Sequence, residues 1–131
     1  MIPKFRAAFK NKILGEVGSI DFVDKTVTIP VYDKLDGDYL GDSVYGLNQV
    51  TLMQSTGKMD STGQVEVYAG DILYYPDQDE DNYGIIKFDK DTLAFVLDNG
   101  YERFVYGDYG MGKVIGNIYE NPELVEGLNE K

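Results

Sequence analysis

The sequence contains no cysteine, no histidine and no tryptophan. Without cysteine there is no disulfide framework, no thiolate nucleophile and no cysteine-ligated metal, a usage that fits a reducing compartment. Without histidine as well, the usual general base and both common catalytic triads are excluded, which leaves carboxylates, lysine, tyrosine or a bound metal for catalysis. We therefore expect a protein that is not an enzyme and that carries no cofactor.

Long apolar runs are also lacking. No stretch approaches the ~20 apolar residues of a membrane helix, and "MIPKFRAAFKNKIL" carries charges where a secretion signal has its apolar region. A chain of 131 residues is long enough to bury a core of its own. We expect a soluble protein of the cytoplasm with no membrane partner.

Positive charge is scarce. The chain has 12 Lys and Arg against 23 Asp and Glu, a formal net charge of -11, so its average field repels duplex DNA. Specific binding of duplex DNA is therefore disfavoured. The charges are uneven, because Lys4, Arg6, Lys10 and Lys12 crowd the N-terminus and residues 77–81 form the densest acidic run. A local basic face remains compatible with this pattern.

Short runs rich in β-branched and aromatic residues dominate the sequence and are separated by Gly and Asn turns. These turns are too short for the crossovers of a parallel sheet, so they favour antiparallel pairing. The pattern predicts a mainly β protein, with about five antiparallel strands between Val65 and Tyr119 curled into a small barrel. The runs are "KTVTIPV", "GQVEVYAGDILYY", "YGIIKFD", "LAFVLDNG", "ERFVYG" and "KVIGNIY".

The first half, residues 1–55, is expected to be a separate β region with one or two short helices in the fold. Residues 18–33 predict a hairpin around a turn at 23–25, with Pro30 at an edge or bulge because it lacks an N–H donor. Residues 34–46, dense in Gly and Asp, are interpreted as a surface loop. One helical turn is predicted near residues 45–54, and a short C-terminal helix from Pro122 onward.

Several motifs resemble, in order, those of the YopX family of small proteins encoded by bacteriophages and prophages of Gram-positive bacteria. They are "LMQSTGKMDSTGQVEVYAGDIL", "YGIIKFD" and "VIGNIYENPEL", preceded by a "KFRA" start at residues 4–7. After that start this chain has Ala8 and Phe9 where the family commonly has Trp and an acidic residue. The resemblance implies an SH3-like barrel with a short C-terminal helix over residues 56–131, and no particular activity. The matching residues are Thr56, Gly57, Asp60, Gly63, Gly70, Asp71, Ile72, Gly116, Asn117, Asn121 and Pro122.

We expect the family-motif residues to be structural. Gly116 inside an apolar run is typical of a bulge or of close approach by a neighbouring segment. Asn117 suits an unusual φ or a side-chain bond to a turn, and Asn121 suits the N-cap of a short helix. Pro122 then takes the first helical position, with Glu123 in the first turn.

Three other patterns allow a chemical role, and for each we favour a structural one. The acidic run at 77–81 suits a weak cation site or, more simply, a solvated hairpin tip. Residues 110–113, "GMGK", suit a phosphate loop or a hairpin turn. Asp71 with Glu66 could form an acid–base pair, but a Gly-Asp before an apolar strand is typical of a turn.

Two functional hypotheses remain. The first is a phage-encoded accessory protein of the host cytoplasm that acts by binding a protein partner, including a homo-oligomer formed through a strand edge. Under this first hypothesis, residues 4–14 either dock onto their own chain or exchange with a second copy. Surface tyrosines, among the 11 of the chain, would suit such recognition. The alternative is an acidic DNA mimic or a nucleic-acid-linked regulator.

Overall fold

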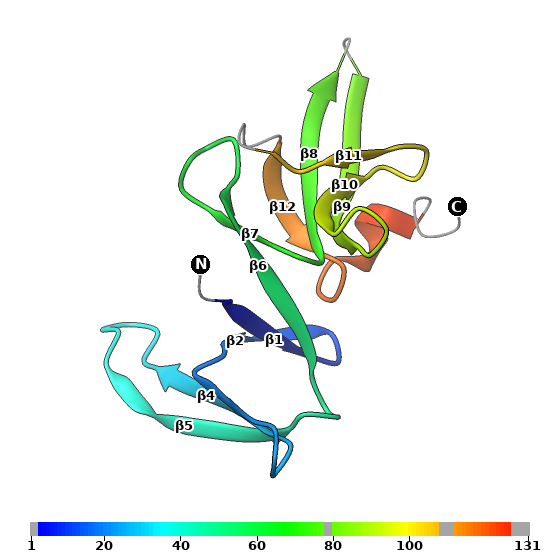
Figure 1. Ribbon diagram of the computed structural model, residues 1–131. Helices are drawn as coiled ribbons and strands as arrows, with labels where there is room; N and C mark the ends of the chain where they lie inside the picture. Colours follow the sequence, from blue (N-terminus) through cyan, green and yellow to red (C-terminus); the bar gives the residue numbers. More distant parts are fainter. Residues whose placement is uncertain (1–2, 78–79, 108–111, 127–131) are drawn as a thin grey trace. The chain divides into compact units, whose positions relative to one another are not determined.

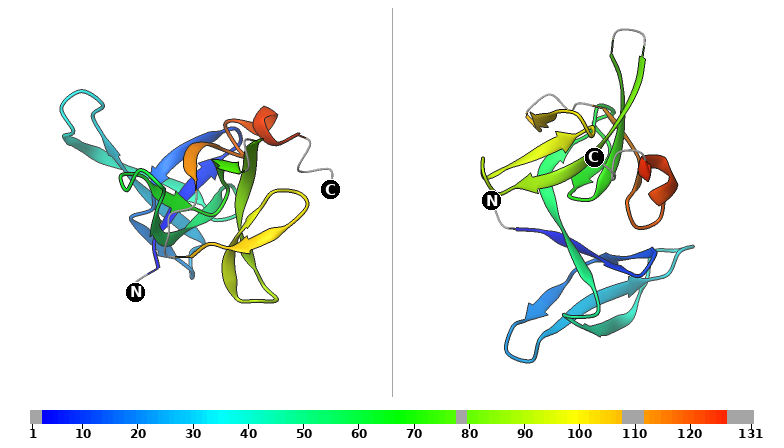
Figure 2. Two further views of the ribbon diagram at one scale, coloured as in Figure 1. Left: turned by 90° about the horizontal axis from the view of Figure 1, so that it is seen from above. Right: turned by 90° about the vertical axis from the view of Figure 1, so that its right-hand side faces the viewer.

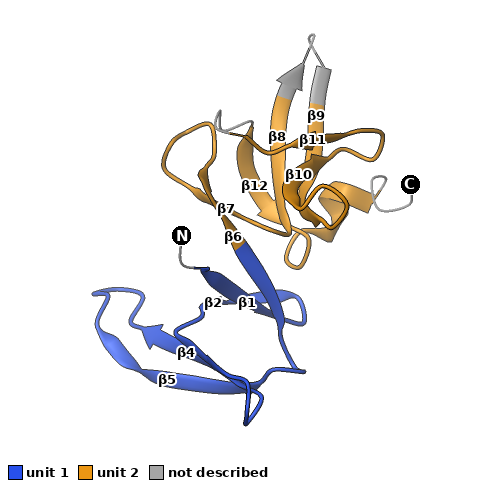
Figure 3. Ribbon diagram, in the orientation of Figure 1, with its two compact units in different colours: residues 1–54 blue, residues 55–131 orange. Residues whose placement is uncertain are grey.

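The computed structural model describes residues 3–77, 80–107 and 112–126 (Figures 1 and 2). The chain divides into two compact units, residues 1–54 and 55–131 (Figure 3). It is mainly β, with three antiparallel sheets, and within the described residues the only helical element is the 3-10 turn η1 (Pro122–Val125). Among those same residues there is no helix with the length and apolar character needed to traverse a bilayer.

The first unit is an N-terminal half-barrel. In one sheet β1 lies between β2 and the start of β6, and in the other β4 lies between β3 and β5. The N-terminal residues are thus paired within their own chain. The strands are β1 (Phe5–Phe9), β2 (Lys12–Glu16), β3 (Ser19–Asp21), β4 (Thr26–Tyr32), β5 (Tyr39–Gly46) and β6 (Thr51–Met59).

Alternation along the strands builds the core of this unit. Ala7 of β1 and Val27 and Ile29 of β4 are buried, because successive residues of a strand face opposite sides. A bulge in the β1–β2 pairing adds Leu14, which packs against the same core. The partly buried residues around this core are Leu14, Val17, Tyr45, Leu47, Val50 and Leu52.

The hairpin predicted around residues 23–25 is confirmed as β3–β4. Its sheet position explains Pro30: the N–H of Gly18 donates to the carbonyl of Thr28 (2.8 Å), so the backbone of Thr28 faces β3. Pro30, two residues on, faces the same side, but β3 pairs only with residues 26–28. Its missing N–H therefore lies where β3 has ended, as an edge position requires.

Two expectations for the first half are wrong. The helical turn predicted near residues 45–54 is instead the end of β5, a turn at residues 47–50 and the start of β6. Burial of Leu47 and Leu52 in the core overrides any local helical preference. Of the predicted loop at 34–46, only residues 34–38 are irregular, and the remainder is β5.

The second unit holds a five-stranded antiparallel sheet in the order β11-β10-β9-β8-β12. The antiparallel strands expected in the C-terminal half are therefore confirmed. β7 pairs with the end of β6 rather than with this sheet. The strands are β7 (Glu66–Tyr68), β8 (Asp71–Asp77), β9 (Glu80–Asp89), β10 (Ala94–Asp98), β11 (Arg103–Val105) and β12 (Lys113–Asn117).

Both faces of this sheet are covered near its centre. Leu73, Ile86 and Leu97 bury one face together with Val67 and Tyr106. On the other face, Ile72 and Ile85 pack against Val125 of η1. Two buried faces explain why "DIL" and "GII" read as apolar runs rather than as an alternation.

Candidate functional site

The family-motif residues lie in the second unit, in the turns between its strands or near the strand ends that these turns join. Gly63 lies in the β6–β7 turn, whereas Gly70 precedes β8 in the β7–β8 turn. Both have a positive φ, 73° and 95°, which glycine adopts without steric cost. Gly63 donates to the Asp60 carbonyl (2.9 Å), and Gly70 donates to the carbonyl of Ile86 (2.8 Å). Each of these two glycines therefore holds its turn in place with a backbone hydrogen bond.

Asp60 connects the β6–β7 turn to β12. Its side chain is buried; Oδ1 accepts the N–H (3.0 Å) and hydroxyl of Thr62, and Oδ2 accepts the N–H of Val114 (3.1 Å). Burial raises the pKa of Asp60, but these hydrogen bonds outweigh burial and hold the pKa below its ordinary value. The carboxylate is therefore ionised at neutral pH and is used for structure.

Thr56 and Gly57 lie in β6 at the point where the register between β6 and β7 shifts. The Thr56 hydroxyl donates to the Val67 carbonyl (2.8 Å), and Gly57, with φ of 75°, donates its N–H to Ser55 Oγ (3.0 Å). Ser55 in turn donates to the carboxylate of Glu66. Side-chain hydrogen bonds of Ser55 and Thr56 therefore join β6 to β7 where the backbone ladder between the two strands is interrupted.

Asp71 closes the β7–β8 turn. It is 1% exposed, and its Oδ2 accepts the N–H of Tyr68 (2.8 Å). Glu66 accepts from Ser55 instead, so each member of the acid–base pair considered from the sequence has a structural hydrogen bond. The turn role of Asp71 is confirmed.

Tyr106 is a buried phenol between these acids. Its hydroxyl donates to the Met59 carbonyl (3.3 Å). Burial raises the pKa of Tyr106 to about 12, and the carboxylates of Asp60 and Asp71 add to the rise. Tyr106 is thus a neutral hydrogen-bond donor at physiological pH, and it is not a base.

Asn117 organises the turn after β12. Its Oδ1 accepts the N–H groups of Tyr119 (3.0 Å) and Glu120 (2.9 Å), and its Nδ2 donates to Glu120 Oε1 (3.0 Å). The predicted side-chain bond to a turn is therefore confirmed. Gly116 lies at a bulge in the β8–β12 pairing, which is also as predicted.

Asn121 is the N-cap residue of η1, as predicted, but its side chain makes no capping hydrogen bond. Its Oδ1 instead accepts the N–H of Asn117 (3.2 Å), folding back over the bulge. A Cβ at Gly116 would lie 2.4 Å from this oxygen, so the two residues are matched in size. Pro122 does occupy the start of η1, with Glu123 in the first turn.

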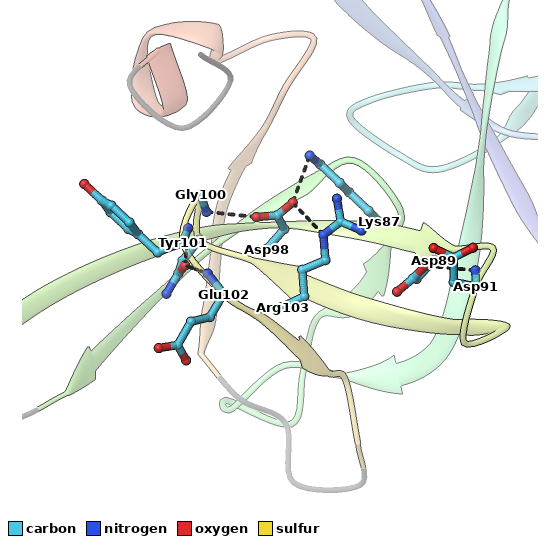
Figure 4. A network of polar contacts seen from close by, with 9 residues as sticks. Lys87, Asp89, Asp91, Asp98, Gly100, Tyr101, Glu102 and Arg103 are labelled. Atoms are coloured by element: carbon cyan, nitrogen blue, oxygen red, sulfur yellow. Dashed lines mark hydrogen bonds and ion pairs between the residues drawn. The ribbon is translucent and has the colours of Figure 1, made fainter. Parts of the chain in front are cut away.

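A second polar network fixes the β10–β11 turn (Figure 4). Asp98 accepts from Lys87 Nζ (3.2 Å), from Arg103 Nε (3.5 Å) and from the N–H of Gly100 (2.8 Å). Burial raises the pKa of Asp98, but Gly100, Lys87 and Arg103 outweigh burial and hold it below its ordinary value. Asn99 closes the same turn by accepting the N–H groups of residues 101 and 102 (2.9 and 2.7 Å).

Two patterns from the sequence lie partly outside the described residues. The acidic run at 77–81 includes residues 78–79, and the loop at 110–113 includes residues 110–111. Within the described ranges, no group of three or more Asp and Glu side chains is arranged to hold a metal ion.

The surface feature that stands apart is the far end of the β4–β5 hairpin, residues 30–44, which we call the β4–β5 arm. β3 pairs with β4 only through Thr28, so beyond that point the hairpin is a two-stranded ribbon that extends away from its sheet (Figure 2, left). Tyr32 and Tyr39 meet edge to face across it, with ring centroids 5.9 Å apart. Its exposed large apolar side chains are Val31, Tyr32, Leu35, Tyr39, Leu40 and Val44.

An open groove of about 730 Å³ lies at the base of this arm. Residues 14–18, from the end of β2 onward, form one wall, and Pro30, Val31, Tyr32 and Lys34 form the other. This surface is not predicted from the sequence, because the Gly and Asp residues of 34–46 are typical of a loop. Leu40 and Val44, an even number of positions apart as on one face of a strand, are the signal that could have shown it.

The fold and the site together define a mainly antiparallel β protein in which the family-motif residues make structural hydrogen bonds and an apolar arm is exposed. The chain belongs to the YopX family: the family model described as "YopX protein" matches residues 4–126. No curated protein matches the chain.

Proposed function

We propose that the protein is a protein-binding module and not an enzyme, and that it acts as a phage or prophage accessory protein in the host cytoplasm. The observation that carries the proposal is the β4–β5 arm. A two-stranded ribbon is marginally stable in water, and solvent-exposed apolar patches mark interaction surfaces. Leu35 is 99% exposed and Leu40 is 63% exposed, which has a cost in water unless a partner covers them.

The chemistry of the motif residues supports a binding role rather than a catalytic one. Asp60, Asp71 and Asn117 each accept backbone N–H groups, so their polar atoms are used in closing turns. Tyr106, the phenol among them, has a pKa raised to about 12. These groups are set up for folding, which leaves recognition to exposed surfaces such as the arm.

The partner we propose is a different protein rather than a second copy. Residues 5–9 form β1, which pairs with β2 and with β6 of the same chain. This pairing already uses the segment whose exchange would have built a homo-oligomer. For the second unit we propose an SH3-like barrel, which the five-stranded antiparallel sheet and the separate β6–β7 pairing support.

One observation favours the alternative, a DNA mimic. Residues 1–54 hold six Lys and Arg and seven Asp and Glu, a net charge of -1, whereas residues 55–131 hold six and sixteen, a net charge of -10. However, Asp60 and Asp71 are buried, and Asp98 is paired with Lys87 and Arg103. Because such carboxylates do not present a row of surface charge, we prefer the protein-binding proposal.

Site-specific photo-crosslinking in host cytosol tests the proposal. A crosslinking residue at Tyr39 samples the arm, and one at Leu93, an exposed position (77%) of the second unit, is the control. We expect a discrete protein adduct from position 39 that is absent from position 93. The partner should then bind the purified wild-type chain and bind the Leu40→Ser variant at least about tenfold more weakly. Equal adducts at both positions, or none at 39, would contradict the proposal.

A further inference from the structure

The β4–β5 arm presents a strand edge. β5 is the end strand of the β3-β4-β5 sheet. Because the Thr28 carbonyl accepts an N–H from the β3 side, its cross-strand neighbour Val44 directs its own N–H and C=O away from β4. Asp42, two residues earlier, directs its backbone to the same outer edge. The edge therefore offers backbone donors and acceptors at alternate residues.

Pro30 agrees with this register. It lies directly opposite Asp42. Proline has no N–H to give, so it is tolerated here only because this pair does not exchange hydrogen bonds. The backbone groups of Asp42 consequently point outward, where an added strand would lie.

Asp42 is held at the centre of this edge. The hydroxyl of Tyr39 donates to Asp42 Oδ1 (2.6 Å), and Asp42 itself is exposed. Exposed apolar side chains flank it, with Leu40 at 63% and Val44 at 62%. Leu40 has no cross-strand partner, because the β4–β5 register shifts there, so it marks the end of the regular edge. The edge thus displays an apolar, acidic, apolar pattern to whatever strand pairs with it.

We propose that the β5 edge captures an extended segment of a partner protein that places Lys or Arg opposite Asp42 and apolar residues two positions to either side. This inference rests on the proposed protein-binding function and names the chemistry of the partner. Strand addition takes its affinity from main-chain bonds and its selectivity from alternate side chains. Opposite charges directly across an antiparallel pair are stabilising.

Charge complementarity selects this occupant over a second copy. Pairing two β5 edges so that Leu40 meets Val44 would place Asp42 directly opposite the Asp42 of the second copy. Like charges in that position are destabilising. The turn of the arm adds three more carboxylates, Asp33, Asp36 and Asp38, against the single cation of Lys34, so the arm attracts a basic strand.

Synthetic peptides titrated into the isotope-labelled full chain test the inference by NMR. The probe is a capped heptapeptide of alternating Thr and Val with Lys at its centre, and the matched peptide has Glu there. At about 1 mM, the concentration range of weak specific binding, the Lys peptide should shift the amide signals of residues 40–46. It should bind about threefold to tenfold more tightly than the Glu peptide.

Charge reversal supplies the decisive comparison. In Asp42→Lys the preference should invert, so that the Glu peptide binds more tightly than the Lys peptide. Asp24→Lys makes the same change in net charge at an exposed turn position and should keep the wild-type preference. An N-methylated Lys peptide, which cannot complete the backbone bonds, should fail to shift these signals.

Three results would overturn the inference: no peptide shifts the amides of residues 40–46, the Lys and Glu peptides bind equally, or Asp24→Lys inverts the preference as Asp42→Lys does. The remaining experiment is a dilution series of the chain without peptide. A concentration-dependent shift of the β5 amides would show a second copy on the edge and would also overturn it. The crosslinking experiment at Tyr39 is independent of these results, so failure here leaves the proposed function separately testable.

Discussion

At the scale of single residues, the buried polar groups of the second unit are matched to backbone N–H groups that a strand or turn leaves unpaired. Asp60 accepts from Thr62 and from Val114, two segments far apart in the sequence. A buried acceptor with ionised oxygens forms stronger bonds than a neutral one. Removing its charge should therefore be felt in the stability of the fold rather than in any chemistry.

We predict that Asp60→Asn lowers the free energy of unfolding by about 1.5–3 kcal/mol, because one charged acceptor becomes an amide whose NH₂ faces backbone donors. Urea denaturation of the full chain measures the change. Asp24→Asn, at an exposed turn, is the control and should stay within about 0.5 kcal/mol of wild type. Equal midpoints for the two variants would show that the Asp60 contacts contribute nothing.

Stability should also depend on pH in the acid range. The folded-state pKa values of Asp60 and Asp98 lie below the ordinary value of 3.8. The unfolded chain then binds more protons than the folded one, so the stabilisation is present above pH ~4 and is lost as pH falls through the folded pKa values. Urea midpoints measured from about pH 6 down to about pH 3 should fall, and they should fall less in Asp60→Asn. A wild-type midpoint that stays constant would contradict the assignment.

The fit between Gly116 and Asn121 gives a sharper test. A Cβ at Gly116 would lie 2.4 Å from Asn121 Oδ1, so Gly116→Ala should destabilise the chain by about 1–3 kcal/mol. The double variant Gly116→Ala, Asn121→Ala should recover part of that loss, since it removes the clashing oxygen. Gly107→Ala, which meets no atom within 4 Å, is the control for the loss of a glycine. The denaturation midpoints of wild type, the two single variants and the double variant measure these differences. A Gly116→Ala variant as stable as Gly107→Ala would refute the predicted clash.

At the scale of elements, the strands that the sequence predicts are those whose β-branched and aromatic runs are bounded by polar or turn residues. β9, β10 and β12 follow this pattern, as does the β3–β4 hairpin. β5 escaped prediction because its Gly41, Asp42 and Ser43 are residues of loops, and only pairing with the core strand β4 makes them a strand. The sequence predicts Asn121 as the N-cap of η1, but not that its side chain accepts from Asn117 instead of capping, because both uses suit an Asn before Pro.

The same pairing makes a prediction about local stability within the β4–β5 hairpin. Near its base the hairpin covers the core through Val27 and Ile29, whereas residues 30–44 form a ribbon with exposed apolar side chains. Amide hydrogen exchange of Gly41, opposite Val31, should therefore be faster than that of Tyr45, opposite Val27. Exchange followed by NMR measures both sites in one sample. Slower exchange at Gly41 would mean that the arm is already covered.

At the scale of the whole molecule, the charge is divided between the two units. Residues 1–54 are close to neutral, with a net charge of -1 from six basic and seven acidic residues, and residues 55–131 hold the remaining -10. The acidic arm of the first unit therefore stands out against its own near-neutral unit. In the proposed complex, the net negative charge of the chain attracts a basic partner, and the β4–β5 arm determines where that partner binds.

The last prediction follows from this overall field. Duplex DNA requires clustered Lys and Arg to release its counterions, and a net charge of -11 opposes its approach. We expect no sequence-selective complex with duplex DNA in a mobility-shift assay at ~150 mM salt, about physiological ionic strength. Lys10 in the β1–β2 turn and Lys12 at the start of β2 are exposed and close in sequence, so Lys10→Glu with Lys12→Glu should weaken any complex seen at lower salt. A sub-micromolar, sequence-selective complex at ~150 mM would instead make the nucleic-acid hypothesis the better one, since ordinary specific affinities lie in that range.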